Sequence, residues 1–377
     1  MLYGTRPTPT TPVPSAPCYR GPVAAAPLTW FDGHLDLAYL VELGRDLHAP
    51  PDSCGGSLLP AAVTLPSLRE GRVRACLGTI FTEAIADGPG QNSKPGPWSY
   101  ALGDAESANL AGRRQLAVYH ALRDAGTISL ITPQPPSPKP QAPSLLLGIL
   151  MECADPITTP DELPWWAERG VLAIGMAWWR GSRYAGGNGT DDGLTNLGRE
   201  LAHAMDALGV VHDLTHLSQR ATDELLSFTD RPVIASHSNC RALLGGRDNK
   251  DWQRHLDDET IREIGRRGGI VGVNLVRNFI KQGIDRSNPD DRPTIDDLLA
   301  HVQQVRNVMG HARGVALGSD MDGGLTAHDL PCGIDSPADL HRIAHALAAR
   351  GWTDDEIHAF AWGNWARFWG VDRTVIA

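Results

Sequence analysis

The chain has 377 residues, of which 42% are hydrophobic and 21% are charged, a composition typical of an ordinary globular protein. Its formal net charge of −10 argues against nucleic acid as the main partner, because phosphate binding needs clustered lysine and arginine. No stretch is apolar for long enough to span a membrane, and the first residues lack the basic and then apolar pattern of a secretory signal. We therefore expect a cytoplasmic protein, whereas the charge says little about a small substrate in a pocket.

The six cysteines are scattered and form no CxxC pair, so neither a disulfide framework nor a cysteine-based zinc site is expected. Residues 1–26 include a stretch rich in proline and threonine, which predicts a disordered or extended lead-in. Residues 27–377 are expected to form a single domain with two surface insertions. These are the Gly- and Pro-rich residues 86–98 and the Pro-rich residues 132–143.

Short apolar runs alternate with longer stretches of helical periodicity along the chain. The expected strands, in chain order, are 28–32, 73–81, 145–151, 171–177, 210–213, 232–236, 269–275 and 314–318. The clearest helices are 104–122, 194–208, 218–228, 258–267, 295–309 and 337–350, and Thr353 is expected to cap a last helix through Phe360. Eight strand and helix units favour a closed (β/α)8 TIM barrel, although an open doubly wound sheet gives the same pattern.

Several expected strands end in residues that bind metals or transfer protons. In such a barrel the C-terminal ends of the strands face the active site. The first strand leads to His34 and Asp36, whose side chains point the same way because they are two residues apart in an extended chain. The third strand is followed by Glu152, the fifth leads to His216, the sixth ends beside His237, and the eighth leads to Asp320.

Three imidazoles and two carboxylates from these positions suit zinc or a similar divalent ion. A bridging carboxylate would let two ions share one hydroxide, and the two ions would activate that water and polarise a substrate carbonyl. Asp320 is then left as a free carboxylate that can move a proton. Each residue alone has an ordinary structural reading, such as a helix cap for Glu152 or a turn for Asp320. Together they predict a metal-dependent hydrolase.

The same segments resemble the membrane dipeptidase (renal dipeptidase) family of zinc metallopeptidases, in its bacterial form. The family's DGHND-type opening is matched by FDGHLDL, and its IEG-type strand by MECADPI. Its long helix and strand signature, which ends in DLSH, is matched most specifically by GLTNLGRELAHAMDALGVVHDLTHLS. Further similar segments are PVIASHSNCRALL, GGIVGVNL, GVALGSDMDGG and GNWARFW, so that the resemblance runs from about residue 29 to residue 370.

The resemblance implies an amidohydrolase-like TIM barrel that hydrolyses dipeptides through metal-bound hydroxide, in bacterial members often with a D-residue at the C-terminal position. It implies two Zn2+ per chain, with Glu152 bridging them and Asp320 as the catalytic proton shuttle. The first ion would be bound by His34 and Asp36, and the second by His216 and His237. Arg247 would bind the substrate carboxylate, its alternative being an ordinary loop arginine. Many members are dimers, so a homodimer is expected.

The chain departs from the family pattern after the fourth strand, where Trp178 stands in place of a histidine that stabilises the tetrahedral intermediate. An indole donates one hydrogen bond but cannot become a cation. The loss of a charged partner for the oxyanion would reduce the rate of hydrolysis by a factor on the order of 10²–10³. Arg180, Arg183 or Asn188 would be near enough in sequence to compensate. Trp178 would also line the substrate site. Its presence leaves open two alternatives to the dipeptidase function. These are a hydrolase acting on another amide, a lactone or an ester, and a non-catalytic metal-binding barrel.

Overall fold

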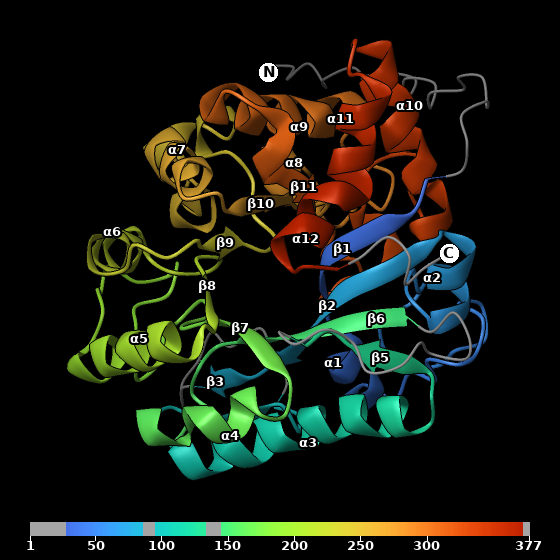
Figure 1. Cartoon of the computed structure of the whole chain (residues 1–377). Coiled ribbons are helices and arrows are strands. Elements are labelled where there is room, and N and C mark those ends of the chain that lie inside the picture. Colours follow the sequence, from blue (N-terminus) through green and yellow to red (C-terminus); the bar gives the residue numbers. More distant parts are fainter. Residues whose placement is uncertain (1–27, 86–94, 133–144, 372–377) are drawn as a thin grey trace, which may run out of the picture.

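The computed structural model describes residues 28–85, 95–132 and 145–371. In the described residues, eight parallel strands form the continuous path of a nine-stranded sheet, and Figure 1 shows the helices around their outside. The strand order follows the chain without the reversal that a doubly wound sheet requires, so the predicted TIM barrel is confirmed and the doubly wound alternative is wrong. The strands are β1 (Trp30–Leu35), β2 (Val73–Phe81), β6 (Leu145–Glu152), β7 (Val171–Gly175), β8 (Val211–Asp213), β9 (Ile234–Ala235), β10 (Ile270–Val273) and β11 (Val315–Leu317).

The barrel closes between its first and last strands through the side chain of Asp32. This carboxylate accepts hydrogen bonds from the backbone N–H of Ser319 at 2.7 Å and of His34 at 3.2 Å. One backbone hydrogen bond, from the N–H of Asp320 to the carbonyl of His34 at 3.3 Å, joins the two strand ends directly. His34 and Asp320 are therefore held side by side, although 286 residues separate them in the sequence.

Three short strands lie outside the predicted set, because runs of three residues carry too little periodicity to be recognised. β5 (Ile128–Leu130) pairs with the first part of β6, and β7 pairs with the last part. β3 (Glu83–Ile85) and β4 (Ser99–Ala101) pair with each other on either side of the predicted insertion 86–98. Most of that insertion, nearly all of residues 132–143 and the predicted lead-in 1–26 lie outside the described residues.

The longer helices match their predicted ranges, and side-chain caps set where they begin. Thr195 and Ser218 each accept a hydrogen bond from a backbone N–H three residues later, so α5 and α6 begin just after them. Thr353 caps α11 as predicted, but the regular helix ends at His358 and a π-helical turn follows. The helices are α1 (Leu37–Glu42), α2 (Leu65–Glu70), α3 (Ala105–Asp124), α4 (Leu163–Ala167), α5 (Asn196–Leu208), α6 (Gln219–Phe228), α7 (Asp258–Arg266), α8 (Arg277–Ile280), α9 (Ile295–Met309), α10 (His341–Ala349), α11 (Asp354–His358) and α12 (Asn364–Phe368).

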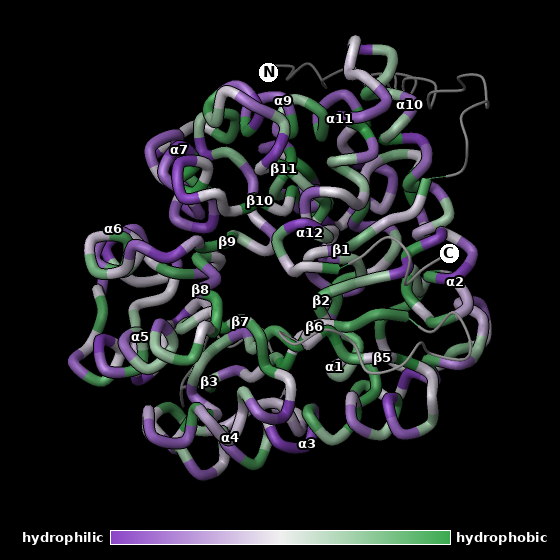
Figure 2. Tube along the Cα trace, in the orientation of Figure 1, coloured by the Kyte–Doolittle hydropathy of each residue, from purple (hydrophilic) through white to green (hydrophobic). Residues whose placement is uncertain are grey.

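Two apolar layers hold the barrel together, one between the strands and the helices and one inside the ring of strands. Figure 2 shows the strands as largely hydrophobic and the outer helices as mixed with hydrophilic residues. Trp362 and Trp365, from the C-terminal segment, pack against Phe31 in the interior. The indole N–H of Trp365 donates to the carbonyl of Leu317 at 2.8 Å, which ties this segment to the last strand.

The alternation of side chains along the strands decides which residues face the interior. Leu150 belongs to the inner apolar layer, so Glu152, two residues later on β6, faces the same way. Leu77 belongs to the same layer, and Thr79 and Phe81 follow it at the same spacing on β2. The inner apolar layer thus gives way to polar and aromatic side chains at the carboxyl ends of the strands.

Two other sequence-based expectations concern thiols and membranes. Cys54, Cys76, Cys153 and Cys240 are buried free thiols, as expected for a chain without a disulfide framework. Among the helices of the described ranges, none has the length and apolar character needed to cross a membrane.

We predict that Gly272→Ala will destabilise the protein by about 3 kcal/mol or more, because strands β9 and β10 leave no room for a Cβ there. A Cβ at Gly272 would overlap the carbonyl oxygen of Ser236. Urea unfolding measures the change. Gly175→Ala on β7 is the matched control, since its new Cβ would lie 3.7 Å from the nearest atoms, an ordinary contact. Equal stability of the two variants would contradict the close approach of these strands.

Candidate metal centre

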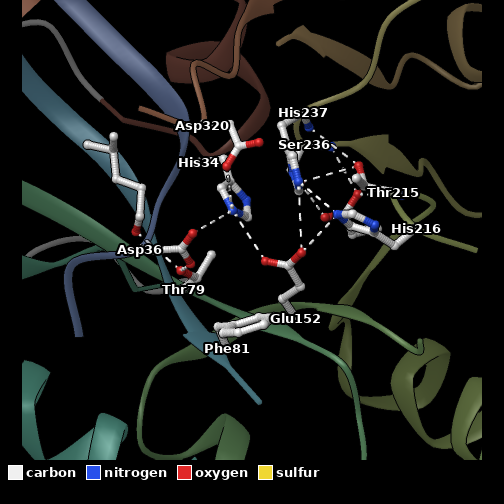
Figure 3. A network of polar contacts seen from close by, with 12 residues as sticks. His34, Asp36, Thr79, Phe81, Glu152, Thr215, His216, Ser236, His237 and Asp320 are labelled. Atoms are coloured by element: carbon white, nitrogen blue, oxygen red, sulfur yellow. Dashed lines mark hydrogen bonds and ion pairs between the residues drawn. The ribbon is translucent and has the colours of Figure 1, made fainter. Parts of the chain in front are cut away.

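The structure brings all six residues predicted to form the centre to one end of the barrel. Figure 3 shows them facing one another from the carboxyl ends of five strands. Each of their side chains is at most 9% exposed. They are His34, Asp36, Glu152, His216, His237 and Asp320.

Glu152 lies between the imidazoles, with one oxygen directed to each side. Its Oε2 is 3.2 Å from Nε2 of His34. Its Oε1 is 3.0 Å from Nε2 of His216 and 3.8 Å from Nε2 of His237. This position between two groups of nitrogen atoms is the one that a bridging carboxylate requires.

His34 takes part in two groups of possible metal ligands. In one, its ring nitrogen lies with Glu152 and His237, and in the other with Asp36 and Asp320, all ligand atoms of a group being within 4.8 Å of one another. Nε2 of His34 is 3.6 Å from Asp36 Oδ2 and 3.9 Å from Asp320 Oδ1. Asp320 is thus close enough to reach an ion beside His34 and Asp36, as well as to transfer a proton.

The hydrogen bonds of Ser236 determine which nitrogen of His237 carries the proton. Its hydroxyl donates to the buried carboxylate of Asp213, and that carboxylate also accepts the Ser236 backbone N–H at 2.9 Å. The hydroxyl oxygen then has no proton left for His237, so it accepts a hydrogen bond from Nδ1–H at 2.9 Å. Nε2 of His237 is therefore the unprotonated nitrogen, with its lone pair directed into the centre.

His216 is oriented in the same way by Asn188, whose side-chain oxygen lies 2.9 Å from Nδ1 and accepts its proton. Nε2 of His216 then presents a lone pair only 3.1 Å from Nε2 of His237. Two lone pairs at this separation repel each other unless a cation or a proton lies between them. The donor set and its orientation therefore fit a divalent ion.

Burial and neighbouring charges shift the pKa values of these residues in opposite directions. Burial, with a smaller contribution from Arg254, lowers the pKa of His216 to about 4, and burial and His34 place the pKa of His237 well below its usual value. Burial would raise the pKa of Glu152, but the charge of the His34 imidazole, 3.2 Å away, holds it well below the usual range. At neutral pH His216 and His237 are therefore neutral and Glu152 ionised, the forms in which all three bind metals.

Two of the predicted residues have a strained backbone. His216 has φ of 67° and Asp320 has φ of 57°, in the left-handed region that residues other than glycine rarely adopt. Cys153, directly after Glu152, has φ of 73°. Each such residue costs on the order of 1–3 kcal/mol, and strain of this kind gathers at functional sites.

The predicted carboxylate-binding residue, Arg247, lies on the surface, with its guanidinium 4.5 Å above the ring of Trp252. A different arginine, Arg254, is buried beside the centre and donates from Nη2 to the carbonyl of His237 at 3.0 Å and from Nη1 to the hydroxyl of Ser238 at 3.4 Å. Sequence reasoning missed Arg254, because nothing in its spacing distinguishes it from other loop arginines. The structure adds it as a second candidate for anion binding.

Trp178 lies at the edge of the centre, half-buried, with its ring centroid 5.9 Å from that of His216. Of the three residues expected to compensate for it, Asn188 reaches the centre through its hydrogen bond to His216. Arg183 donates to backbone carbonyls of residues 155–158, and Arg180 is exposed and stacks on the neighbouring indole. Neither guanidinium takes the place of the missing histidine.

Residues 25–375, which include the barrel and every residue of the centre, match the family model described as membrane dipeptidase (peptidase family M19). The chain belongs to this family. A relative that is 32% identical over 206 residues is an uncharacterised protein from the pqqA 5′ region of Klebsiella pneumoniae, and the match covers 52% of this chain and 71% of that protein. An uncharacterised dipeptidase of Schizosaccharomyces pombe is 31% identical over 183 residues, 48% of this chain and 40% of that one.

A solved structure with the same fold is a metallopeptidase from Rhodobacter sphaeroides, liganded with a phosphinate mimic of the dipeptide L-Ala-D-Ala. It has a TM-score of 0.70 and 22% identity, and the match covers 91% of this chain and 98% of that one. Family membership makes the chain a hydrolase of the metallo-dipeptidase class, which argues against a non-catalytic metal-binding barrel.

We predict that Asp320→Asn will change how the stability of the metal-free protein depends on pH. Burial raises the pKa of Asp320 from 3.8 to about 7, so between these values the folded state holds a proton that the unfolded state releases. The contribution of Asp320 to the stability of the wild type therefore falls as the pH rises from about 4 to about 7. Urea unfolding after chelation should show the variant gaining about 1–3 kcal/mol relative to the wild type between pH 5 and pH 7. A difference that does not change with pH would contradict the shift.

Proposed function

We propose that the protein is a binuclear zinc dipeptidase, in which His34 and Asp36 bind one ion and His216 and His237 bind the other. Glu152 is the bridging ligand. The observation that carries this proposal is the convergence of lone pairs on the side of His216 and His237. Their Nε2 atoms are 3.1 Å apart, and Glu152 Oε1 lies 3.0 Å from one and 3.8 Å from the other. Nitrogen and carboxylate ligands in this number suit Zn2+.

When bound, two zinc ions supply an activated water and polarise the scissile carbonyl. Asp320, whose Oδ1 lies 3.9 Å from Nε2 of His34, would accept a proton at the reaction site and pass it to the leaving amine. The side-chain amide of Asn274 donates to Asp320 Oδ2 at 2.8 Å, which leaves Oδ1 directed toward His34. One oxygen is thus held in place while the other is directed to the reaction site.

The substrate carboxylate needs a cation near the centre, and Arg254 is better placed for this than Arg247. Its buried guanidinium donates to the backbone carbonyl of His237, whereas Arg247 is exposed and stacked on Trp252. We extend the proposal to dipeptides whose C-terminal residue has the D configuration. The Rhodobacter sphaeroides enzyme, which shares this fold, is liganded with a mimic of such a dipeptide.

The wild type should hold about two zinc ions per chain and cleave members of a panel of L-Xaa-L-Xaa and L-Xaa-D-Xaa dipeptides. Chelation should abolish cleavage, and zinc should restore it. Asp320→Asn should keep zinc but lose at least about 10²-fold in kcat, because the proton shuttle is gone. Metal analysis and amino-acid release measure these outcomes. A chain that binds no metal after zinc reconstitution would disprove the proposal.

The hydrogen bond between Ser236 and His237 provides a separate test of the second ion. Ser236→Ala removes the acceptor that fixes the tautomer of His237, and we expect zinc affinity to fall about 10- to 100-fold. Competition with a chelating indicator measures this affinity. Ser67→Ala is the control, because this buried serine caps α2 away from the centre and should affect stability but not zinc binding. Equal zinc affinities of the two variants would contradict the role of this hydrogen bond in orienting His237 for the ion.

Trp178 favours a second candidate function at the same centre, the hydrolysis of another amide, a lactone or an ester. Its indole cannot become the cation that stabilises a tetrahedral intermediate. Simple lactones and esters therefore belong in the same substrate panel. Two bound zinc ions with turnover of these compounds but not of dipeptides would favour this alternative.

A further inference from the structure

Four aromatic side chains form a continuous row that ends at the metal centre, and we call this row the aromatic wall. Its members, in order, are Trp98, Tyr39, Phe81 and Trp178. The centroids of successive rings are 4.8, 5.3 and 5.2 Å apart, and the rings meet nearly edge to face. The last ring is the one that lies 5.9 Å from the ring of His216.

The aromatic wall runs alongside the ligands of the centre. Phe81 is the register partner of Glu152 on the neighbouring strand, and Figure 3 shows its ring beside the Glu152 side chain. Tyr39 follows Asp36 by three residues on α1, and burial and the charge of Asp36 raise its pKa. The wall therefore follows the centre from the first pair of ligands, past the bridging residue, to the second pair.

The wall is partly open to a ligand. Trp98, at the far end of the row, is 9% exposed, whereas Tyr39, Phe81 and Trp178 are only half-buried. Tyr39 comes after β1, Phe81 is the last residue of β2, and Trp178 comes after β7. Three separate parts of the chain therefore each place an aromatic ring at the same rim of the barrel. Aromatic rings in such a position bury a large area of an apolar partner.

The polar groups that would handle the rest of a dipeptide lie on the other side of the centre. Figure 3 shows Asp320 and Phe81 on opposite sides of the pair formed by His34 and Glu152. Arg254, the buried cation, contacts the carbonyl of His237. A dipeptide with its carboxylate toward this arginine and its scissile carbonyl at the centre would place the side chain of its N-terminal residue toward the wall.

We infer that the aromatic wall binds a large apolar or aromatic side chain on the N-terminal residue of the substrate, and that Trp178 is the main determinant of this selectivity. The inference rests on the proposed dipeptidase function, from which it takes the orientation of the substrate. A hydrophobic pocket discriminates between side chains that differ by one methylene about 10- to 200-fold. A benzyl group should therefore be preferred over a methyl group by at least about tenfold.

The first test compares kcat/KM for Phe-Ala and Ala-Ala. The wild type should prefer Phe-Ala by at least about tenfold, and Trp178→Ala should reduce this preference to about threefold or less. Trp178→Phe should keep most of it. The ratio cancels any loss of correctly folded enzyme, so a merely structural defect would not change it. Trp165→Ala is the matched control, because this half-buried tryptophan lies on α4, stacked against Arg113 and Arg169, and should leave the ratio unchanged.

The second test measures binding without turnover. Two phosphinate dipeptide analogues, with benzyl or methyl on the N-terminal residue, are titrated calorimetrically into the zinc-loaded wild type and into Trp178→Ala. A benzyl preference that is lost in the variant supports the inference. Equal binding of the two analogues and equal cleavage of the two dipeptides by the wild type would overturn it and leave the dipeptidase function intact. A zinc-loaded wild type that binds neither analogue and cleaves no dipeptide would overturn the proposed function and this inference together.

Discussion

Three carboxylates and three imidazoles are buried together at one end of the barrel, and their mutual charge is the constraint on which the rest of the site depends. A buried ion costs several kcal/mol unless other groups compensate it. Glu152 stays ionised because the His34 imidazole faces it, whereas burial keeps a proton on Asp320 up to about pH 7. Divalent ions would compensate the same negative charge more completely and would also accept the lone pairs that now face one another. The arrangement is thus costly for an empty protein and suited to a protein that holds metal.

The packing of the barrel offsets the free-energy cost of the buried charges and the strained backbone at the site. His216 and Asp320 adopt left-handed backbone conformations, and they keep them because the strands around them are fixed by dense packing. Asp32 joins the first strand to the loop after the last one, and this link places Asp320 next to His34. The apolar interior beneath the site, with two tryptophans against Phe31, holds the strand ends in register. Stability of the barrel and geometry of the centre are therefore coupled.

The sequence predicts the strands and the cluster of His, Asp and Glu well, because both depend on short-range patterns. Apolar runs mark the strands, and the period of two fixes which side of a strand faces inward, as for His34 and Asp36. The arginines show where such reasoning ends. Arg247 and Arg254 both lie in an irregular segment without periodicity, and only the folded chain shows that the second is buried against His237. The three short strands were missed for the same reason, since pairing with distant segments defines them and local pattern does not.

Trp178 is the residue at which the family pattern and this chain differ most in their chemistry. Without a histidine at this position, no cationic side chain of residues 171–180 faces the centre, since Arg180 stacks outward on the next indole. Stabilisation of a developing oxyanion would then depend on the metals and on Arg254. The indole instead extends an apolar row along the ligands, and through its contact with Phe81 it would connect the site of bond cleavage to the side chain of the substrate. With an apolar surface in place of a cation, this residue would serve substrate selection and no longer rate enhancement. The ratio of kcat/KM for two substrates is therefore more informative here than the rate on either one.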